Sequence, residues 1–286
     1  MNETPSIVTV DGTKALRIRF VDRLPGGRPA LATFAHPYPR FAVAESLGVE
    51  ELLALSICPE PEEDRLRLLL LPAGLASPQE LLKQAEEWMH RGGLSAGQPT
   101  ADLMLRSERI LWRPGQALLI GPPERLQEVL PGLIEFAFYE SELRKLEGEI
   151  ESDWPTVEAD ADLTHSVTSA GLERRSHVDE MTLCTTRRRM RFARLEPCLE
   201  KASIALTGPA RRLATELAMQ AEVIDRLGWL DDRIEVCEDL YELANDRLSE
   251  FTYFHREFRL ELWIIVLLVA EVVIMAAELW YLVRHP

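Results

Sequence analysis

The sequence predicts an α+β N-terminal head, followed by long coiled-coil-like helices and one C-terminal transmembrane helix. Three observations support this prediction: β-rich runs alternate with capped helical segments in the first half, a helical spacing of apolar residues continues through the second half, and an apolar stretch ends the chain. We expect a head over residues 1–146, an acidic linker over 147–170, a helical hairpin or stalk over 171–259, and a membrane helix with a short tail over 260–286.

The composition is that of a folded chain with an acidic surface. Hydrophobic residues make up 47% of the 286 residues, enough to bury a core. The formal net charge of -15 argues against general binding of nucleic acid, because affinity for phosphate comes from clustered cations. Four scattered cysteines without C-x-x-C spacing predict reduced thiols rather than a zinc site or disulfides. The N-terminus does not resemble a secretory segment, so we expect synthesis into the cytosol.

Strands are predicted in the head where β-rich runs lie between turn residues. The run at 16–21 alternates apolar and polar residues and is followed by the breaker Leu24-Pro-Gly-Gly, and a later apolar run is closed by Pro72. The predicted strands cover residues 7–10, 16–21, 65–71, 109–112 and 116–120. Helices are expected after Ser77-Pro78 and after Gly121, where an N-cap or early prolines precede spaced apolar residues. Alternating strands and helices make this half α+β.

Beyond an acidic stretch at 147–162, apolar residues recur in steps of three and four. This spacing predicts a coiled-coil-like seam, with one change of phase beside Gly228. The seam must pack on another helix, either the segment 174–203 folding back or a second subunit, and both remain open. Its residues are Leu230, Ile234, Cys237, Tyr241, Ala244, Leu248, Phe251, His255, Phe258 and Leu262.

The apolar stretch 262–283 is about 33 Å long as a helix, which is enough to cross a bilayer core of about 30 Å. Trp263 at one end, and Trp280 and Tyr281 at the other, match the aromatic belts of the two interfaces. We therefore expect a tail-anchored, single-pass protein that contacts membrane lipid, with its N-terminal region on the cytoplasmic or organelle-matrix side.

Glu271 and Glu278 interrupt this stretch. They are seven residues apart and share one helical face, so both can turn away from lipid. We expect them to fix packing between the helices of a homo-oligomer. A path for ions or protons, and a helix buried in a soluble core, are the two alternatives.

A basic patch lies on the predicted helix after the linker. Contact with RNA or the ribosome, or with anionic lipid, is one interpretation; a solvated face that pairs with acidic segments of the same chain is the other. Aromatic residues that could stack on bases are nearly absent from it. The patch comprises Arg187, Arg188, Arg189, Arg191 and Arg194.

Motifs for catalysis, metal binding or nucleotide binding are not found. The histidines lack metal-ligand spacing, His177 with Asp179 and Glu180 being the nearest to a ligand group, and the glycine pairs lack a phosphate-loop context. Serines lie outside any nucleophile-elbow motif. We therefore expect no metal, no cofactor, no small-molecule substrate and no enzymatic activity.

The C-terminal third resembles the family named for being required for meiotic nuclear division. The likeness lies in Ala218 to Leu279, where a leucine-rich helix leads through RLELWIIVLLVAEVVI into a terminal apolar helix. The matching residues are Arg259, Leu260, Glu261, Trp263, Ile264, Ile265, Glu271, Val272 and Val273. The resemblance implies a membrane-anchored, non-enzymatic domain, with a mitochondrial member tied to organellar translation.

The sequence thus predicts a membrane-anchored, self-assembling scaffold without enzymatic activity. One alternative is a membrane adaptor that contacts ribosomes or RNA through the arginines. Another is an anchored head that binds a ligand or acts as a hydrolase.

Overall fold

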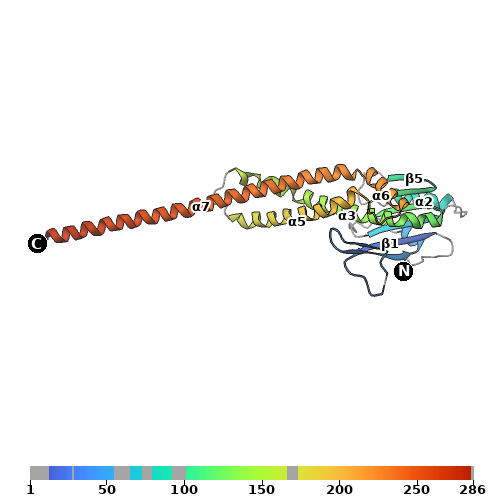
Figure 1. The fold of residues 1–286 in the computed structure, drawn as a ribbon, viewed down its shortest axis with the longest axis horizontal. Helices are drawn as coiled ribbons and strands as arrows, with labels where there is room; N and C mark the ends of the chain where they lie inside the picture. Colours follow the sequence, from blue (N-terminus) through green and yellow to red (C-terminus); the bar gives the residue numbers. More distant parts are fainter. Residues whose placement is uncertain are drawn as a thin grey trace. The chain divides into compact units, whose positions relative to one another are not determined.

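The computed structural model describes residues 13–27, 29–54, 65–72, 79–91, 101–165 and 173–284 (Figure 1). The predicted α+β head and long helices are confirmed, whereas the expected strand at 7–10 and the cap at Ser77-Pro78 lie outside the described residues. The elements are β1 (Lys14–Val21), β2 (Ala32–Phe34), β3 (Arg40–Leu47), α1 (Val49–Ala54), β4 (Arg65–Pro72), α2 (Gln79–Arg91), β5 (Ala101–Leu105), β6 (Glu108–Arg113), β7 (Gln116–Gly121), α3 (Pro123–Asp160), η1 (Ala161–Thr164), α5 (Arg175–Glu200), α6 (Gly208–Gln220) and α7 (Val223–Arg284).

The chain divides into two compact units that are not consecutive in sequence. The first unit comprises Met1–Ser152 and Arg188–Arg233, and the second comprises Asp153–Arg187 and Ile234–Pro286. Helices α3, α5 and α7 therefore each contribute residues to both units.

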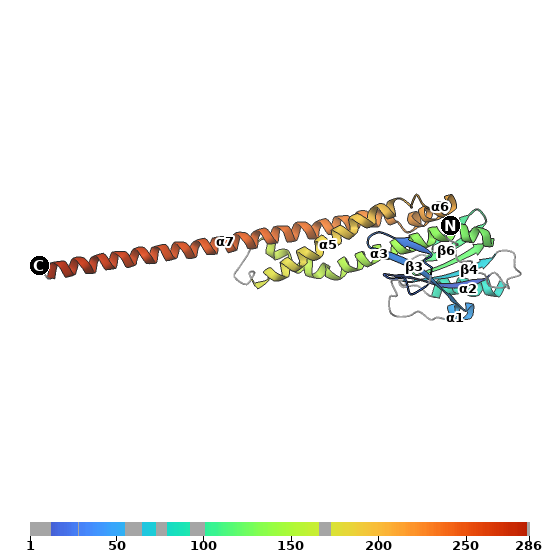
Figure 2. The same cartoon turned by 60° about the horizontal axis from the view of Figure 1, so that its bottom comes forward.

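A seven-stranded sheet forms the centre of the first unit, in the order β2-β3-β1-β4-β7-β6-β5. Strands β4 and β7 are parallel, and the other neighbours are antiparallel. Helix α3 covers one face of the sheet, while α1 and α2 lie against the other (Figure 2). The crossover between β4 and β7 contains α2 and the β5–β6 pair, as a parallel connection requires a long excursion.

The α3 face of the sheet is closed by aromatic packing. Phe34 stacks on Phe138 of α3 with ring centroids 4.0 Å apart, and Phe20 lies 5.2 Å from the same ring. Trp112 meets Phe136 edge-on at 4.9 Å. Offset and edge-to-face pairs of this kind stabilise a core beyond their buried area. The alternation of apolar residues in 16–21 places Phe20 on this face.

Helix α6 approaches α3 closely, and a glycine makes this possible. A Cβ atom on Gly132 would lie 2.1 Å from the carbonyl oxygen of Ala210. Helix α6 begins at Gly208, with Thr207 as its N-cap and the following proline in its first turn. It ends before Glu222, whose φ of 50° separates α6 from α7. Helix α7 runs through Gly228 without interruption, so the change of phase expected there falls within a continuous helix.

The acidic stretch at 147–162 is helical through Asp160, where α3 ends, and continues into η1. Its carboxylates satisfy cations of neighbouring helices: Glu149 pairs with Arg191 at 2.6 Å and Glu147 pairs with Arg226 at 2.7 Å. Pro197 lies inside the last turn of α5 rather than ending it.

Candidate functional site

In the second unit, the predicted seam of α7 is buried between α3, η1 and α5. Tyr241 is 1% exposed, and Ala244 and Leu248 are fully buried against Val157 and Val178. Apolar residues in steps of four and three thus face the neighbouring helices, as expected of a helix packed in a bundle. Within this unit, the chain's own helices cover the seam as far as Leu248.

A buried carboxylate fixes this packing. Asp160, at the end of α3, has no exposed surface and accepts hydrogen bonds from Arg174, from Tyr241 Oη at 3.0 Å and from His177 Nε2 at 2.8 Å. Burial, and then the hydrogen bond to Asp160, raise the pKa of Tyr241. His177 is thus a partner of Asp160, and the residues that the structure describes include no cluster that could hold a metal ion.

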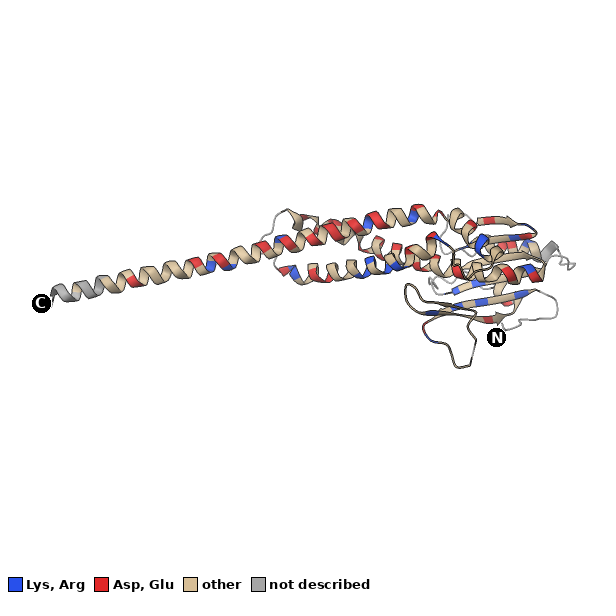
Figure 3. Cartoon of the chain, in the orientation of Figure 1, with Lys and Arg blue, Asp and Glu red and all other residues tan. Residues whose placement is uncertain are grey.

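Beyond Leu248 the same seam emerges: Phe251 is half-buried, and the seam positions from His255 onward are exposed. Phe251 stacks on His255 at 5.7 Å, Phe258 is 63% exposed and Leu262 is 51% exposed. From residue 262 to residue 275 apolar side chains surround the helix, and Figure 3 shows this part of α7 with little charge. We call residues 251–275 the outer segment of α7. Further exposed members are Leu260, Trp263, Ile264, Ile265, Val266, Leu267, Leu268, Val269, Val272, Val273, Ile274 and Met275.

The expected transmembrane helix over 260–286 is wrong. Among the residues that the structure describes, none of the helices combines the length and the apolar character that crossing a membrane requires. The expected tail-anchored, single-pass placement and the orientation derived from it are wrong for the same reason.

The residues assigned to the membrane segment are placed as follows. Glu271, Trp263 and Trp280 are exposed on α7, the two indoles at 64% and 62%. The side chains of Glu278 and Tyr281 lie outside the described part of the chain.

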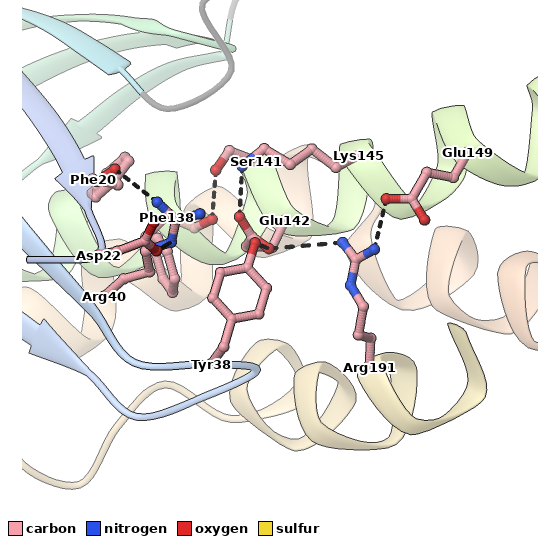
Figure 4. A network of polar contacts seen from close by, with 10 residues as sticks. All are labelled: Phe20, Asp22, Tyr38, Arg40, Phe138, Ser141, Glu142, Lys145, Glu149 and Arg191. Carbon is pink, nitrogen blue, oxygen red and sulfur yellow. Dashed lines mark hydrogen bonds and ion pairs between the residues drawn. The ribbon is translucent and has the colours of Figure 1, made fainter. Parts of the chain in front are cut away.

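Three arginines of the basic patch are engaged in ion pairs within the first unit. Arg189 pairs with Asp231 of α7, and Arg191 pairs with Glu149 at 2.6 Å (Figure 4). Arg188 lies 3.6 Å from Glu149. Arg187 and Arg194 are exposed, and Arg194 also donates to the carbonyl of Pro37 at 3.3 Å. A surface for RNA would need these cations to be available, so the geometry favours an internal role for much of the patch.

Sequence reasoning missed two buried glutamates on α3. Glu142 is 1% exposed and accepts a hydrogen bond from Tyr38 and one from Lys145 at 2.7 Å (Figure 4). Burial, and then the hydrogen bond to Glu142, raise the pKa of Tyr38. Glu140 is bound by Arg144 and, at 3.3 Å, by Arg226. Every one of these carboxylates has a cation beside it, as buried acids require, so the network fixes the fold rather than supplying a free acid or base.

A small cavity of about 100 Å³ lies between α3, α5 and α6 in the first unit, with Glu135, Tyr139 and Cys198 among its lining. Burial raises the pKa of the Cys198 thiol above its ordinary value, although a hydrogen bond with Tyr139 opposes the change. Burial also raises the pKa of Glu135, against the hydrogen bond it accepts from the backbone N–H of Ser203. A raised pKa disfavours the thiolate, which is the nucleophilic form of a cysteine.

Comparison with family models and with curated proteins finds no match for this chain. The resemblance of the C-terminal third to the family required for meiotic nuclear division stays a prediction. The candidate functional feature is therefore α7 itself, whose apolar seam continues beyond the helices that cover it.

Proposed function

We propose that the chain is a self-assembling scaffold, in which the outer segment of α7 packs on the same segment of other copies. The observation that carries this proposal is the continuity of the seam. It is buried up to Leu248 by the chain's own helices and continues at the same spacing through Phe258 and Leu262, where the side chains are exposed. Because the same spacing of apolar residues packs on partner helices in the inner part of α7, we expect it to pack on partner helices in the outer segment as well.

The charges beside the seam suit a second copy. Residues 255–261 carry Arg256 and Arg259 with Glu257 and Glu261, so two copies meet without a net like-charge clash. Between residues 262 and 275 the charged residue is Glu271. A helix that is apolar all round is stable only when it is buried, which favours a bundle of copies over a single edge contact.

The energetics allow this association. Burying four of these side chains from each of two copies contributes roughly 12 to 24 kcal/mol, at roughly 1.5 to 3 kcal/mol per side chain. Association costs roughly 4 to 15 kcal/mol in lost translational and rotational freedom. The exposed apolar residues of the outer segment outnumber the four that this comparison uses.

Sedimentation of the full chain tests the proposal. Serine at Leu262, Ile265 and Val269, which continue the spacing of the seam in steps of three and four, should convert an assembly of defined stoichiometry into a monomer. The matched control is Ile204→Ser, which removes a side chain that is 91% exposed outside α7 and should leave the assembly unchanged. A wild-type chain that is monomeric at every concentration, free or on lipid vesicles, would overturn the proposal.

A further inference from the structure

The sheet face that carries α1 and α2 changes character from one row of residues to the next. Strand register aligns residues of neighbouring strands into rows that share a face. One such row is apolar and packs under α1 and α2. It consists of Leu47, Ala15, Leu69, Leu118 and Leu111.

Two residues further along each strand, the row on the same face is polar across five strands. The row after that begins again with arginines, Arg19 of β1 opposite Arg65 of β4. Figure 3 shows Lys and Arg on several strands of the sheet. The first polar row consists of Glu45, Arg17, Arg67, Gln116 and Arg113.

Two pairs of arginines face one another across β1 and β4. Arg17 lies directly opposite Arg67, and Arg19 directly opposite Arg65, and like charges at directly opposed positions destabilise an antiparallel pair. Glu45 forms an ion pair with Arg19 at 3.6 Å and lies directly opposite Arg17 in the register, so β3 supplies one acid beside these arginines. An anion between the pairs would convert the repulsion into binding energy.

A hollow adjoins these arginines at the end of β1. Its volume is about 680 Å³, and Arg19, Arg23, Arg40 and Arg65 line it with Asp22 as the acid among its lining residues. Arg40 is held by Asp22 at 2.9 Å and by the carbonyl of Phe20 at 3.3 Å. The hollow is thus positively charged in a chain whose net charge is -15.

Gln116 gives a second, independent indication of a ligand. It is 2% exposed, and neither its amide nitrogen nor its amide oxygen has a hydrogen-bond partner among the described residues. It stands beside Arg67 in the polar row. The Nε of Arg17 is likewise buried and without a partner there. Buried polar atoms are almost always satisfied, by protein, water or ligand.

We propose that this face of the sheet binds a small anion with two or more phosphoryl groups. Arg17 and Arg67 hold one group, and Arg19 and Arg65 hold the next, since rows two residues apart along a strand are about 7 Å apart. Guanidinium forks match phosphate oxygens in pairs, and the amide of Gln116 hydrogen-bonds the same ligand. The acidic chain as a whole repels a long polyanion, which favours a compact ligand over nucleic acid.

Calorimetric titration of the full chain with inorganic pyrophosphate tests this site. Saturable binding is expected, weakened at least about tenfold by Arg17→Gln and by Arg65→Gln, because each removes a charge-assisted contact. Gln116→Leu should weaken binding by a smaller factor. Arg125→Gln is the matched control: this exposed arginine of α3 pairs with Glu128, and its loss should leave the affinity unchanged.

Thermal unfolding supplies a second measurement. Pyrophosphate should raise the melting temperature of the wild-type chain, and Arg17→Gln should remove most of that rise. The site is contradicted if pyrophosphate does not bind saturably or binds all the variants equally. It is also contradicted if RNA binds this face in place of pyrophosphate. These outcomes are independent of assembly through α7, since every residue lies in or beside the sheet.

Discussion

Helix α7 contains two regions with one sequence pattern and opposite surroundings. From Ile234 to Leu248 the seam residues are buried, and from Phe258 onward the residues at the same spacing are more than half exposed. This difference shows that apolar residues in steps of four and three predict that a helix needs a partner helix. The spacing does not predict which chain supplies that partner. In the inner region the chain supplies the partner; in the outer segment we propose that a second copy does.

The largest effect that separates the two regions is expected from truncating a seam leucine in each. Leu248→Ala should lower the free energy of unfolding by about 3 to 5 kcal/mol, because it leaves a cavity in a closed core. Leu262→Ala should leave the unfolding of the dissociated monomer unchanged and weaken assembly. Chemical denaturation at low concentration measures the stability of the monomer, and sedimentation measures assembly. Equal destabilisation of the monomer by the two variants would contradict the difference between the inner region and the outer segment.

The inner region should also depend on its buried carboxylate. Asp160→Asn should cost about 2 to 3 kcal/mol, because Arg174, His177 and Tyr241 lose a charged acceptor. Asp179→Asn changes an exposed aspartate on α5 and serves as the control, with an expected effect within about 0.5 kcal/mol. An Asp160→Asn chain as stable as the control would show that the carboxylate does not fix the inner packing.

A smaller effect concerns pH. The pKa of Tyr241 is raised above its ordinary value of 10.0 by burial and by Asp160, so the folded state favours the neutral phenol. The stability this contributes is complete below pH 10 and declines above it, because the unfolded tyrosine ionises first. Tyr241→Phe should make the unfolding free energy fall less steeply above pH 10 in alkaline denaturation. An unchanged alkaline slope would contradict this.

The smallest effect expected is a gain. Gly228 lies within α7, and a Cβ atom there would meet nothing within 4 Å. Gly228→Ala should therefore stabilise the chain by about 0.5 to 1 kcal/mol through helix propensity. Gly132→Ala, which would clash with Ala210, should instead destabilise by about 1 to 3 kcal/mol. Thermal unfolding of the two variants gives the signs, and a loss for Gly228→Ala would indicate a neighbour that the isolated chain lacks.

Much of the fold could be predicted from the sequence where local chemistry decides it. The alternation in 16–21, the run closed by Pro72 and the prolines after Gly121 locate β1, β4 and the start of α3. The predicted strands do not include β2, β3 or β5. Strand β2 has three residues, which are too few to show an alternation of apolar and polar side chains.

The candidate sites were harder to predict, because they depend on contacts between distant segments. The exposure of the outer segment follows from where α3 ends and α5 begins, and the spacing of residues in α7 cannot show this. The arginine rows had a local signal, since Arg17 and Arg19 alternate with Leu16 and Ile18, as do Arg65 and Arg67 with Leu66 and Leu68. Only the strand register shows that these alternations face one another. Glu140 and Glu142 carry no local signal in the sequence, because their burial depends on partners from other segments.

Amide hydrogen exchange along α7, measured at several concentrations of the full chain, tests the central claim most directly. Residues 234–248 should be equally protected at every concentration, because their partners belong to the same chain. Residues 258–275 should exchange quickly at low concentration and become protected as concentration rises and copies assemble. Protection of the outer segment that does not change with concentration would contradict self-assembly through α7.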